Sequence, residues 1–146
     1  MLILCGYSGC GKSTLAEAYA KQFGATVVDT DRELETRFGK PVRTLHLEWG
    51  ETRFREEEGD VLASLSQEID VLALGGGTLC REENRVLAQE RGRLLYLYVA
   101  PEILWARLQQ RALPPTFVAA GHAAFLAHYE QRHALYTRWC ERILHG

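Results

Sequence analysis

Near its start the chain reads Leu2-Ile3-Leu4-Cys5-Gly6-Tyr7-Ser8-Gly9-Cys10-Gly11-Lys12-Ser13-Thr14. An apolar run typical of a buried strand is followed there by the pattern G-x-x-x-x-G-K-[ST], the phosphate-binding loop that joins a strand to a helix. Its glycines let the backbone curl so that successive N–H groups point at phosphate oxygens, and the next helix aims its positive end at the same anion. The pattern predicts that the protein binds a nucleoside triphosphate.

The loop divides nucleotide binding among its residues. Lys12 is expected to reach the β- and γ-phosphates, and the hydroxyl of Ser13 to hold Mg²⁺. The other expected nucleotide contacts in the loop come from Gly9, Cys10, Gly11 and Thr14. The helix that follows is expected to be amphipathic and to end at Gly24. Its apolar side is expected to carry Leu15, Ala18, Tyr19, Gln22 and Phe23.

Length, composition and charge limit what the protein does. A chain of 146 residues, 47% of them hydrophobic, suits one domain, expected to span residues 1–146. The net charge of -2 gives no basic face for nucleic acid. No segment reaches the roughly 18 apolar residues that a membrane span needs. We expect a small-molecule substrate as partner, no nucleic acid or membrane, and a monomer or weak homo-oligomer.

Cysteine usage and the start of the chain both favour the cytoplasm. The four cysteines lie far apart without a C-x-x-C pair, which favours reduced thiols over a disulfide framework. The first expected strand begins at Leu2 and leaves no room for a signal peptide. The five histidines show no zinc-like spacing with cysteines or carboxylates, and we assign them no role.

Apolar runs alternate with helical patterns along almost the whole chain, which is typical of an α/β fold with a parallel sheet covered on both faces. Strands are expected at Leu2–Cys5, Thr26–Asp29, Ile69–Leu74, Leu94–Val99 and Ile143–His145. Helices are expected at Ser13–Phe23, Arg32–Phe38, Glu51–Ser66, Glu82–Glu90, Glu102–Gln110 and Ala123–Cys140. Thr30 and Glu33 are expected to form a capping box for the second helix. The segment Arg111–Gly121 contains Pro114-Pro115 and is expected to be a loop and candidate lid.

Asp29-Thr30-Asp31 follows the second expected strand, at the edge of a parallel sheet where ligands bind. Two carboxylates separated by one residue in an extended segment point in different directions, which allows them separate tasks. Asp29 would face the shell of Mg²⁺, and Asp31 would face an incoming hydroxyl whose proton it accepts. The alternative is that Asp31 only favours the N-terminus of the next helix by its charge.

Arg55 lies in the charged run Phe54-Arg55-Glu56-Glu57-Glu58 on an expected helix. A guanidinium fork suits the carboxylate of a small anionic acceptor, and the alternative is a solvated surface residue. Glu58, three residues on, would steady Arg55 from the same helix face. Gly75-Gly76-Gly77 ends the third expected strand, which favours a close approach of the backbone to a ligand or metal over the alternative of a flexible turn.

Further arginines are candidates for the site. Arg111, beside the two prolines, would come down on the phosphates as a lid arginine. Arg132 would be a second carboxylate clamp or an ordinary surface residue. Arg107 would stack on a base or cap the negative end of its helix.

Taken together, the motifs resemble the shikimate kinase family over nearly the whole chain, from Leu2 to about Leu144. They are the phosphate loop, Asp29-Thr30-Asp31, Gly50-Glu51 through Phe54-Arg55 and Glu58, the triple glycine, and Arg132-His133-Ala134-Leu135-Tyr136. The resemblance implies transfer of the ATP γ-phosphoryl group, with Mg²⁺, to the 3-hydroxyl of shikimate, a small cyclic triol carboxylate of aromatic amino-acid biosynthesis. It also implies a P-loop three-layer fold of the nucleoside-monophosphate-kinase type with a five-stranded parallel sheet. The substrate-binding region would lie at about residues 31–62 and the lid at about residues 111–121.

The resemblance further implies roles for single residues. Lys12 and Ser13 match the phosphate and Mg²⁺ positions. Asp29 matches the residue that orients metal-bound water, and Asp31 matches the one that contacts substrate hydroxyls as base or positioning group. The residues that match the surroundings of the acceptor carboxylate and ring are Arg55, Gly76 and Arg132, and the neighbouring Gly77 is also expected to bind the substrate. Those that match the lid arginine and an arginine near the adenine are Arg111 and Arg107.

The sequence departs from the family pattern at several points. The lid of the family starts Arg-Pro-Leu-Leu, which is Arg111-Ala112-Leu113-Pro114 here, and Ala134 replaces the proline of Arg-x-Pro-x-Tyr. Family members continue beyond the position of Gly146 with an adenine-contacting loop and a closing helix. Without them we expect weaker nucleotide affinity and an exposed part of the sheet.

Two other functions fit the same residues. One is a kinase of another small hydroxy acid such as gluconate, because Arg55 and Arg132 indicate a carboxylate without naming the acceptor. The other is a degenerate nucleotide- or shikimate-binding protein with little turnover. A GTPase or a transporter ATPase is not favoured, because the chain has no N-K-x-D and no L-S-G-G-Q motif.

Overall fold

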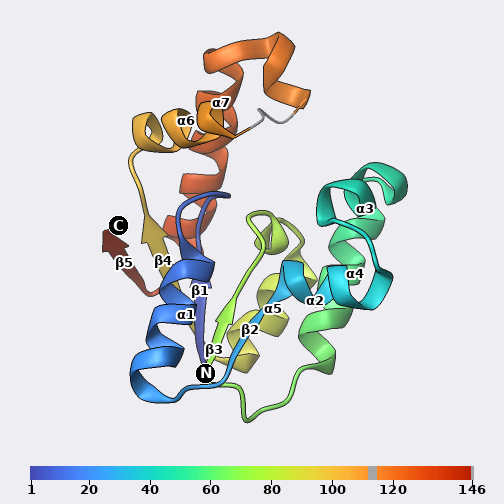
Figure 1. Ribbon diagram of the computed structural model, residues 1–146, viewed down its shortest axis with the longest axis vertical. Coiled ribbons are helices and arrows are strands. Elements are labelled where there is room, and N and C mark those ends of the chain that lie inside the picture. Colours follow the sequence, from blue (N-terminus) through green and yellow to red (C-terminus); the bar gives the residue numbers. More distant parts are fainter. Residues whose placement is uncertain (112–114, 146) are drawn as a thin grey trace.

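The computed structural model describes residues 1–111 and 115–145. A parallel five-stranded sheet forms its centre, in the order β2-β3-β1-β4-β5 (Figure 1). The strands are β1 (Leu2–Cys5), β2 (Val27–Asp29), β3 (Val71–Ala73), β4 (Arg93–Tyr98) and β5 (Arg142–His145). Leu2 of the central strand pairs with Val71 on one side and with Arg93 on the other. The expected α/β fold with a parallel sheet is confirmed.

Helices connect the strands and cover the sheet (Figure 1). They are α1 (Lys12–Phe23), α2 (Thr30–Phe38), α3 (Val42–Trp49), α4 (Glu51–Ser64), α5 (Glu82–Arg91), α6 (Pro101–Gln110) and α7 (Pro115–Trp139), with a 3-10 turn η1 (Thr78–Cys80). In the described part of the chain, no helix combines the length and the apolar character that crossing a membrane requires.

The central strand β1 is buried on both faces, which explains its unbroken apolar sequence. Successive side chains of a strand point to opposite faces. Ile3 therefore joins the large core that contains Val61 of α4, whereas Leu4 packs in a smaller core with Ala16 of α1. The chain thus covers the two faces of the sheet with different helices, and the loop after β1 emerges between them.

Helices α6 and α7 build a separate apolar cluster beyond the carboxyl ends of the strands (Figure 1). Phe125 and Tyr129 of α7 pack there with Leu104 of α6 and Leu97 of β4. α7 is interrupted at Gly121, whose φ of 72° and ψ of -164° are not helical. The cluster places the second half of α7, and with it Arg132, over the end of β1.

Two expectations about secondary structure are wrong. Helix α3 was not expected; it starts directly after Pro41, whose φ of -58° suits the beginning of a helix. The segment expected as a loop at 111–121 is helical over residues 115–120, because a proline is tolerated in the first turn of a helix. Residues 112–114 of the expected lid lie outside the described residues.

The expected capping box of α2 is also wrong. The side chain of Asp29 caps this helix, because its Oδ1 accepts hydrogen bonds from the backbone N–H groups of Asp31 at 3.0 Å and Arg32 at 3.3 Å. Thr30 is instead fully buried, and its hydroxyl accepts a hydrogen bond from the N–H of Gly75 at 2.8 Å. The threonine therefore ties α2 to the loop after β3.

The apolar side expected for α1 faces outward. Leu15 and Tyr19 are each 39% exposed and Phe23 is 63% exposed, whereas Lys12 and Ala16 are the buried residues of this helix. A small alanine lets the helix lie close to the sheet, so the larger side chains turn away from it. Apolar spacing alone predicted the wrong face of α1, because Lys12 of the phosphate loop occupies part of the face that packs against the sheet.

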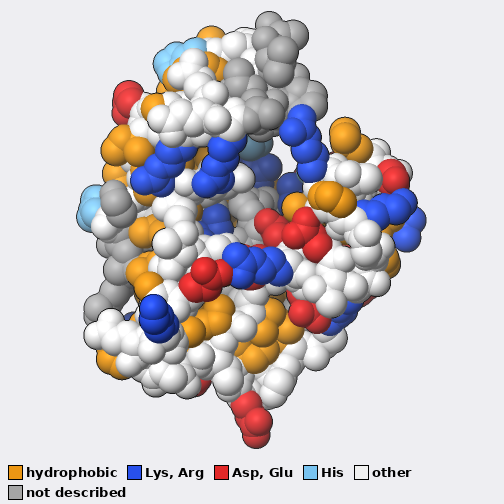
Figure 2. Space-filling model, in the orientation of Figure 1, with side chains coloured by type: hydrophobic (Ala, Val, Ile, Leu, Met, Phe, Trp, Pro, Cys, Tyr) orange, Lys and Arg blue, Asp and Glu red, His pale blue; other side chains and the backbone are white. Residues whose placement is uncertain are grey.

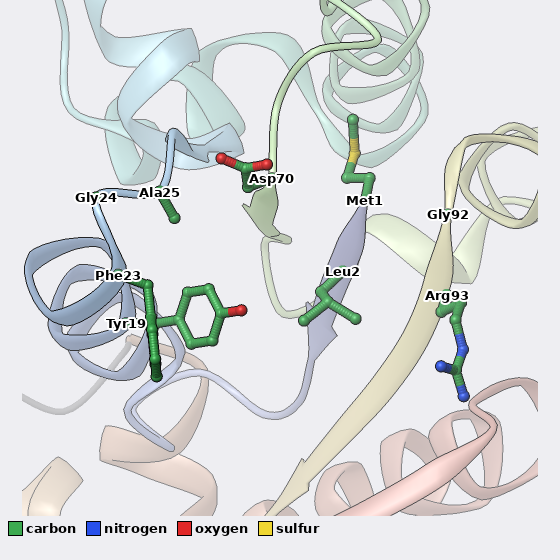
Figure 3. Close-up of a pocket in the computed structure, with 9 residues that line it drawn as sticks. All are labelled: Met1, Leu2, Tyr19, Phe23, Gly24, Ala25, Asp70, Gly92 and Arg93. Atoms are coloured by element: carbon green, nitrogen blue, oxygen red, sulfur yellow. The ribbon is translucent and has the colours of Figure 1, made fainter.

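A shallow hollow of about 410 Å³ lies at the amino ends of the strands, away from the phosphate loop (Figure 3). Tyr19 and Phe23 of α1 border it with ring centroids 4.7 Å apart. Asp70 and Arg93, at the starts of β3 and β4, line its other sides. We assign this hollow no part in the chemistry.

Candidate active site

The loop between β1 and α1 has the geometry that phosphate binding requires. Gly9 and Gly11 adopt φ values of 83° and 99°, which residues other than glycine rarely adopt. The Nζ of Lys12 donates to the carbonyl oxygens of Gly6 at 2.7 Å and Tyr7 at 3.0 Å. The lysine is therefore folded over its own loop, with its ammonium group held at the loop carbonyls.

Ser13 and Asp29 meet at the edge of the loop. The hydroxyl of Ser13 donates to Oδ2 of Asp29, while Oδ1 of the same carboxylate caps α2. Mg²⁺ in kinases is held by one or two protein oxygens together with phosphate oxygens and water. The pair supplies hard oxygen donors of this kind, so the two residues expected at the metal fit it.

A cavity of about 830 Å³ opens over the phosphate loop. It is lined by every residue expected to bind the nucleotide, Gly9, Cys10, Gly11, Lys12, Ser13, Thr14, Arg107 and Arg111. Nη1 of Arg107 donates to the carbonyl oxygen of Gly9 at 3.0 Å, so this guanidinium lies against the loop. Figure 2 shows the hollowed face, with Lys and Arg side chains gathered along its upper margin and acidic side chains below them. The arrangement suits a polyphosphate.

A second cavity of about 770 Å³ adjoins the first one. It is lined by the residues expected around the acceptor, Asp31, Arg55, Gly76, Gly77 and Arg132. Asp31 lines both cavities, together with Ser8 and Gly76. The structure therefore brings the expected acceptor residues together and places a carboxylate between the two cavities.

Burial and neighbouring charges make Asp31 an unusual acid. Burial, together with the negative charges of Glu58 and Asp29 and against the positive charge of Lys12, raises the pKa of its carboxyl to about 6. At pH 7 the group is mostly ionised, yet it binds a proton far more readily than an ordinary aspartate. Such a carboxylate suits the role of a general base.

Arg55 is held by carboxylates on its own helix. Its Nε donates to Oε1 of Glu51 and its Nη1 to Oε1 of Glu58, both at 2.7 Å. Glu58 is fully buried, and burial raises its pKa although Arg55 acts to lower it. The partner expected three residues along is thus confirmed, and Arg55 is a fixed group rather than a solvated one.

Two buried polar residues that the sequence analysis missed complete this support. The hydroxyl of Thr78 donates to Oε2 of Glu58, and Nδ2 of Asn84 donates to the backbone carbonyls of Arg55 at 2.8 Å and Thr78 at 3.1 Å. Thr78 and Asn84 are both fully buried. Because buried polar groups need partners, these bonds fix η1 and the start of α5 against α4. The roles of Thr78 and Asn84 are hard to predict from the sequence, because the residues they contact in α4 lie far away in the chain.

The triple glycine makes room for side chains of the site. A Cβ on Gly77 would overlap the guanidinium of Arg55, and one on Gly75 would lie 2.7 Å from Oε2 of Glu58 and 2.8 Å from Oδ1 of Asp31. The close approach predicted for these glycines is therefore present, but at Gly75 and Gly77 it is made to protein side chains.

Arg132 faces the acceptor cavity from α7. Its Nη1 donates to the carbonyl oxygen of Gly76 at 3.3 Å and contacts Sγ of Cys80, and its Nη2 lies 3.3 Å from Nε2 of His128. Tyr136, one turn further on, donates its hydroxyl to the carbonyls of Gly6 and Gly76. The helix is thereby fastened to the ends of β1 and β3, and Arg132 is an ordered member of the site.

The family follows from comparison with known proteins. The shikimate kinase family model matches residues 8–146. The shikimate kinase of Bacillus anthracis is 38% identical over 135 residues, which are 92% of this chain and 82% of that protein. The chain belongs to the shikimate kinase family. It is therefore an ATP-dependent small-molecule kinase, and the family uses ATP and Mg²⁺.

Solved structures agree with this assignment. The shikimate kinase of Acinetobacter baumannii, solved in complex with shikimate, is 28% identical with a TM-score of 0.89, over 99% of this chain and 82% of that one. A gluconokinase of Sinorhizobium meliloti is only 17% identical with a TM-score of 0.51, over 96% of this chain and 93% of that one. The second likeness shows a shared fold alone, so the gluconate alternative is not favoured.

Proposed function

We propose that this kinase transfers the γ-phosphoryl group of ATP to the 3-hydroxyl of shikimate, within aromatic amino-acid biosynthesis. The observation that carries the proposal is the position of Asp31, which lines the phosphate-loop cavity and the arginine-lined cavity at once. A group at that junction reaches both the hydroxyl that attacks and the phosphoryl group that is transferred.

The nucleotide occupies the cavity over the phosphate loop. Lys12 leaves the carbonyls of Gly6 and Tyr7 and binds phosphate oxygens, while Arg107 and Arg111 supply further positive charge from α6 and its end. Ser13 and Asp29 would hold Mg²⁺, which would neutralise charge on the transferring phosphates. The remaining loop residues bind through backbone N–H groups.

The acceptor occupies the neighbouring cavity. Arg55 and Arg132 approach it from α4 and α7 and bind its carboxylate, a group for which guanidinium forks are well suited. Glu51 and Glu58 accept hydrogen bonds from Nε and Nη1 of Arg55, and Nη2 has no bond among those described, so its N–H groups are left to donate to the acceptor carboxylate. Gly76 and Gly77 give the acceptor a floor of backbone.

In this proposal the phosphoryl group passes directly from ATP to the acceptor, and the protein forms no covalent bond with it. The oxygen of the acceptor hydroxyl forms a bond with the γ-phosphorus as the bond from that phosphorus to the bridging oxygen of ADP breaks. The hydroxyl proton passes to Asp31, whose raised pKa favours its acceptance. Since proton transfer lags phosphoryl transfer in a loose transition state, Asp31 first orients the hydroxyl and then takes the proton.

The proposal extends to organisation and location. Residues 31–62 form the substrate-binding region, residues 111–121 the lid, and residues 1–146 one domain. The four cysteines, Cys5, Cys10, Cys80 and Cys140, are free thiols, which supports a cytoplasmic location. We propose a monomer or weak homo-oligomer that acts on a small molecule and not on nucleic acid.

A coupled assay of ADP release tests the function. The purified chain is given ATP and Mg²⁺ with shikimate, gluconate or a nucleoside monophosphate, and the phosphorylated product is identified by ³¹P NMR. ADP release with shikimate and formation of a new phosphate monoester are expected. If ADP release is faster with another acceptor, that compound replaces shikimate as the proposed substrate. ATP binding without ADP release from any acceptor would instead support the nucleotide-binding protein with little turnover.

A further inference from the structure

Tyr7 and His128 link the phosphate loop to Arg132. The Oη of Tyr7 lies 2.7 Å from Nδ1 of His128, and Nε2 of the same ring lies 3.3 Å from Nη2 of Arg132. All three residues line the acceptor cavity. They form a continuous chain of hydrogen bonds that the phosphate-loop motif and the arginine assignments do not explain.

Arg132 decides the direction of every hydrogen bond in this chain. A guanidinium has only N–H donors, so Nε2 of His128 must be the acceptor. In a neutral imidazole the proton then resides on Nδ1, and Nδ1–H donates to Oη of Tyr7. The hydroxyl proton of Tyr7 is left to donate to a third group, and the described residues provide no other partner for it.

The electrostatic surroundings keep both groups in the states that this pattern needs. Burial lowers the pKa of His128, the guanidinium groups of Arg132 and Arg55 lower it further, and Glu51 opposes them. The ring is therefore neutral near pH 7. Burial raises the pKa of Tyr7 to about 12, so its hydroxyl keeps its proton.

The Tyr7 ring is held rigidly in place. It is 5% exposed, and it packs edge-on against Phe125 with ring centroids 5.6 Å apart. Its backbone carbonyl belongs to the phosphate loop, where it accepts hydrogen bonds from Lys12 and from the N–H of Cys10. The direction of its hydroxyl is thus set by the loop on one side and by His128 on the other.

We propose that His128 is a positioning residue and Tyr7 a binding residue for the acceptor. His128 holds the guanidinium of Arg132 in place and directs the hydroxyl proton of Tyr7 to the acceptor, so that its carboxylate receives hydrogen bonds from a phenol as well as from arginine. The inference rests on the proposed function, because it needs a carboxylate-bearing acceptor in this cavity.

Matched substitutions test the role of His128. His128→Leu removes both hydrogen bonds, whereas His128→Gln keeps an oxygen to accept from Arg132 and an N–H₂ to donate to Tyr7. In steady-state assays His128→Leu is expected to raise the KM for shikimate about tenfold, with the KM for ATP unchanged. His128→Gln is expected to restore most of the loss. His122→Leu, the same change at an exposed site of α7, is the control and should behave as wild type.

A double substitution tests the link to Tyr7. Tyr7→Phe is expected to raise the KM for shikimate in the wild-type background, and to add little in the His128→Leu background, because the hydroxyl is no longer directed. Melting temperatures of all variants show whether the fold is intact. Full additivity of the two changes would overturn the proposed link.

The outcome separates this inference from the proposed function. If wild-type protein phosphorylates shikimate and His128→Leu leaves the KM for shikimate unchanged, the inference fails and the function stands. It also fails if His128→Gln is no better than His128→Leu, since packing alone would then explain the residue. If wild type has no turnover, calorimetric titration of shikimate into the same variants makes the same comparison of affinities.

Discussion

Glu58 and Arg55 form the buried ion pair of the acceptor site, with 2.7 Å between Oε1 and Nη1 and side-chain exposures of 0% and 9%. Removing Glu58 leaves Nη1 of Arg55 and the hydroxyl of Thr78 without their acceptor in a place with little water. The pair therefore links the stability of α4 to the position of the guanidinium that lines the acceptor cavity.

Glu58→Ala is expected to lower the free energy of unfolding by about 3 kcal/mol, because Nη1 of Arg55 and the hydroxyl of Thr78 both lose their buried acceptor and a cavity remains. The KM for shikimate is expected to rise in the same variant, since the guanidinium loses its orientation. Urea unfolding and steady-state kinetics measure the two effects. Glu57→Ala is the control, because Glu57 pairs loosely with Arg53 at 3.7 Å, and a loss as large as that of Glu58→Ala would contradict the argument.

Gly77→Ala is expected to displace Arg55, because the added Cβ would overlap its guanidinium. The KM for shikimate should rise about tenfold or more while the KM for ATP stays the same, since the phosphate loop is not touched. Kinetics with each substrate varied in turn make the comparison. An unchanged KM for shikimate would show that the guanidinium can bind the acceptor from another position.

Much of the site could be predicted because its residues are close in sequence. The phosphate loop is one continuous motif, and the pairing of Arg55 with Glu58 follows from their spacing on a helix. The cap of α2 was misread, because Asp29 and Thr30 are both good capping residues and the buried partner of Thr30, Gly75, lies 45 residues away. The sequence around Thr30 therefore does not indicate that its hydroxyl is used by Gly75.

The parts that could not be predicted depend on contacts between distant elements. Thr78 meets Glu58 across 20 residues, and His128 meets Tyr7 across 121. Neither contact has a sequence pattern, so Thr78, Asn84 and His128 were assigned no role. The outward face of α1 was missed for a related reason, since the inner face of this helix is occupied by Lys12 of the site itself.

The activity is expected to fall as the pH is lowered through about 6, the value to which burial, followed by Glu58 and Asp29, raises the pKa of Asp31. Below that pH the carboxyl is protonated and cannot accept the proton of the acceptor hydroxyl. The profile of kcat/KM for shikimate between pH 5 and 8 measures this. Asp31→Asn should lose most of the activity, and its remaining activity should no longer fall as the pH is lowered through about 6. If the fall is unchanged in that variant, the titration of another group causes it.

Asp31 is also expected to reduce stability at neutral pH. Its folded pKa of about 6 exceeds the ordinary value of 3.8, so between these pH values the native state binds more protons than the unfolded state. The free energy of unfolding contributed by this group therefore decreases as the pH rises from about 4 to about 6. Asp31→Asn should melt at a higher temperature than wild type at pH 7, and the difference should shrink at pH 4. A lower melting temperature at pH 7 would mean that the ionised carboxylate is stabilised after all.

Lys12→Ala is expected to reduce kcat by about 10²–10³ with little effect on folding. The variant lacks the ammonium group that would bind the transferring phosphoryl oxygens, and this interaction acts mainly in the transition state. The fold should tolerate the change, since the two carbonyls that Lys12 occupies keep other donors. Tyr136 donates its hydroxyl to Gly6, and the N–H of Cys10 donates to Tyr7. Lys21→Ala, at an exposed position in the last turn of the same helix, is the matched control and should retain wild-type rates. If both lysine variants turned over shikimate at similar rates, the ammonium group of Lys12 would have no part in the transfer step.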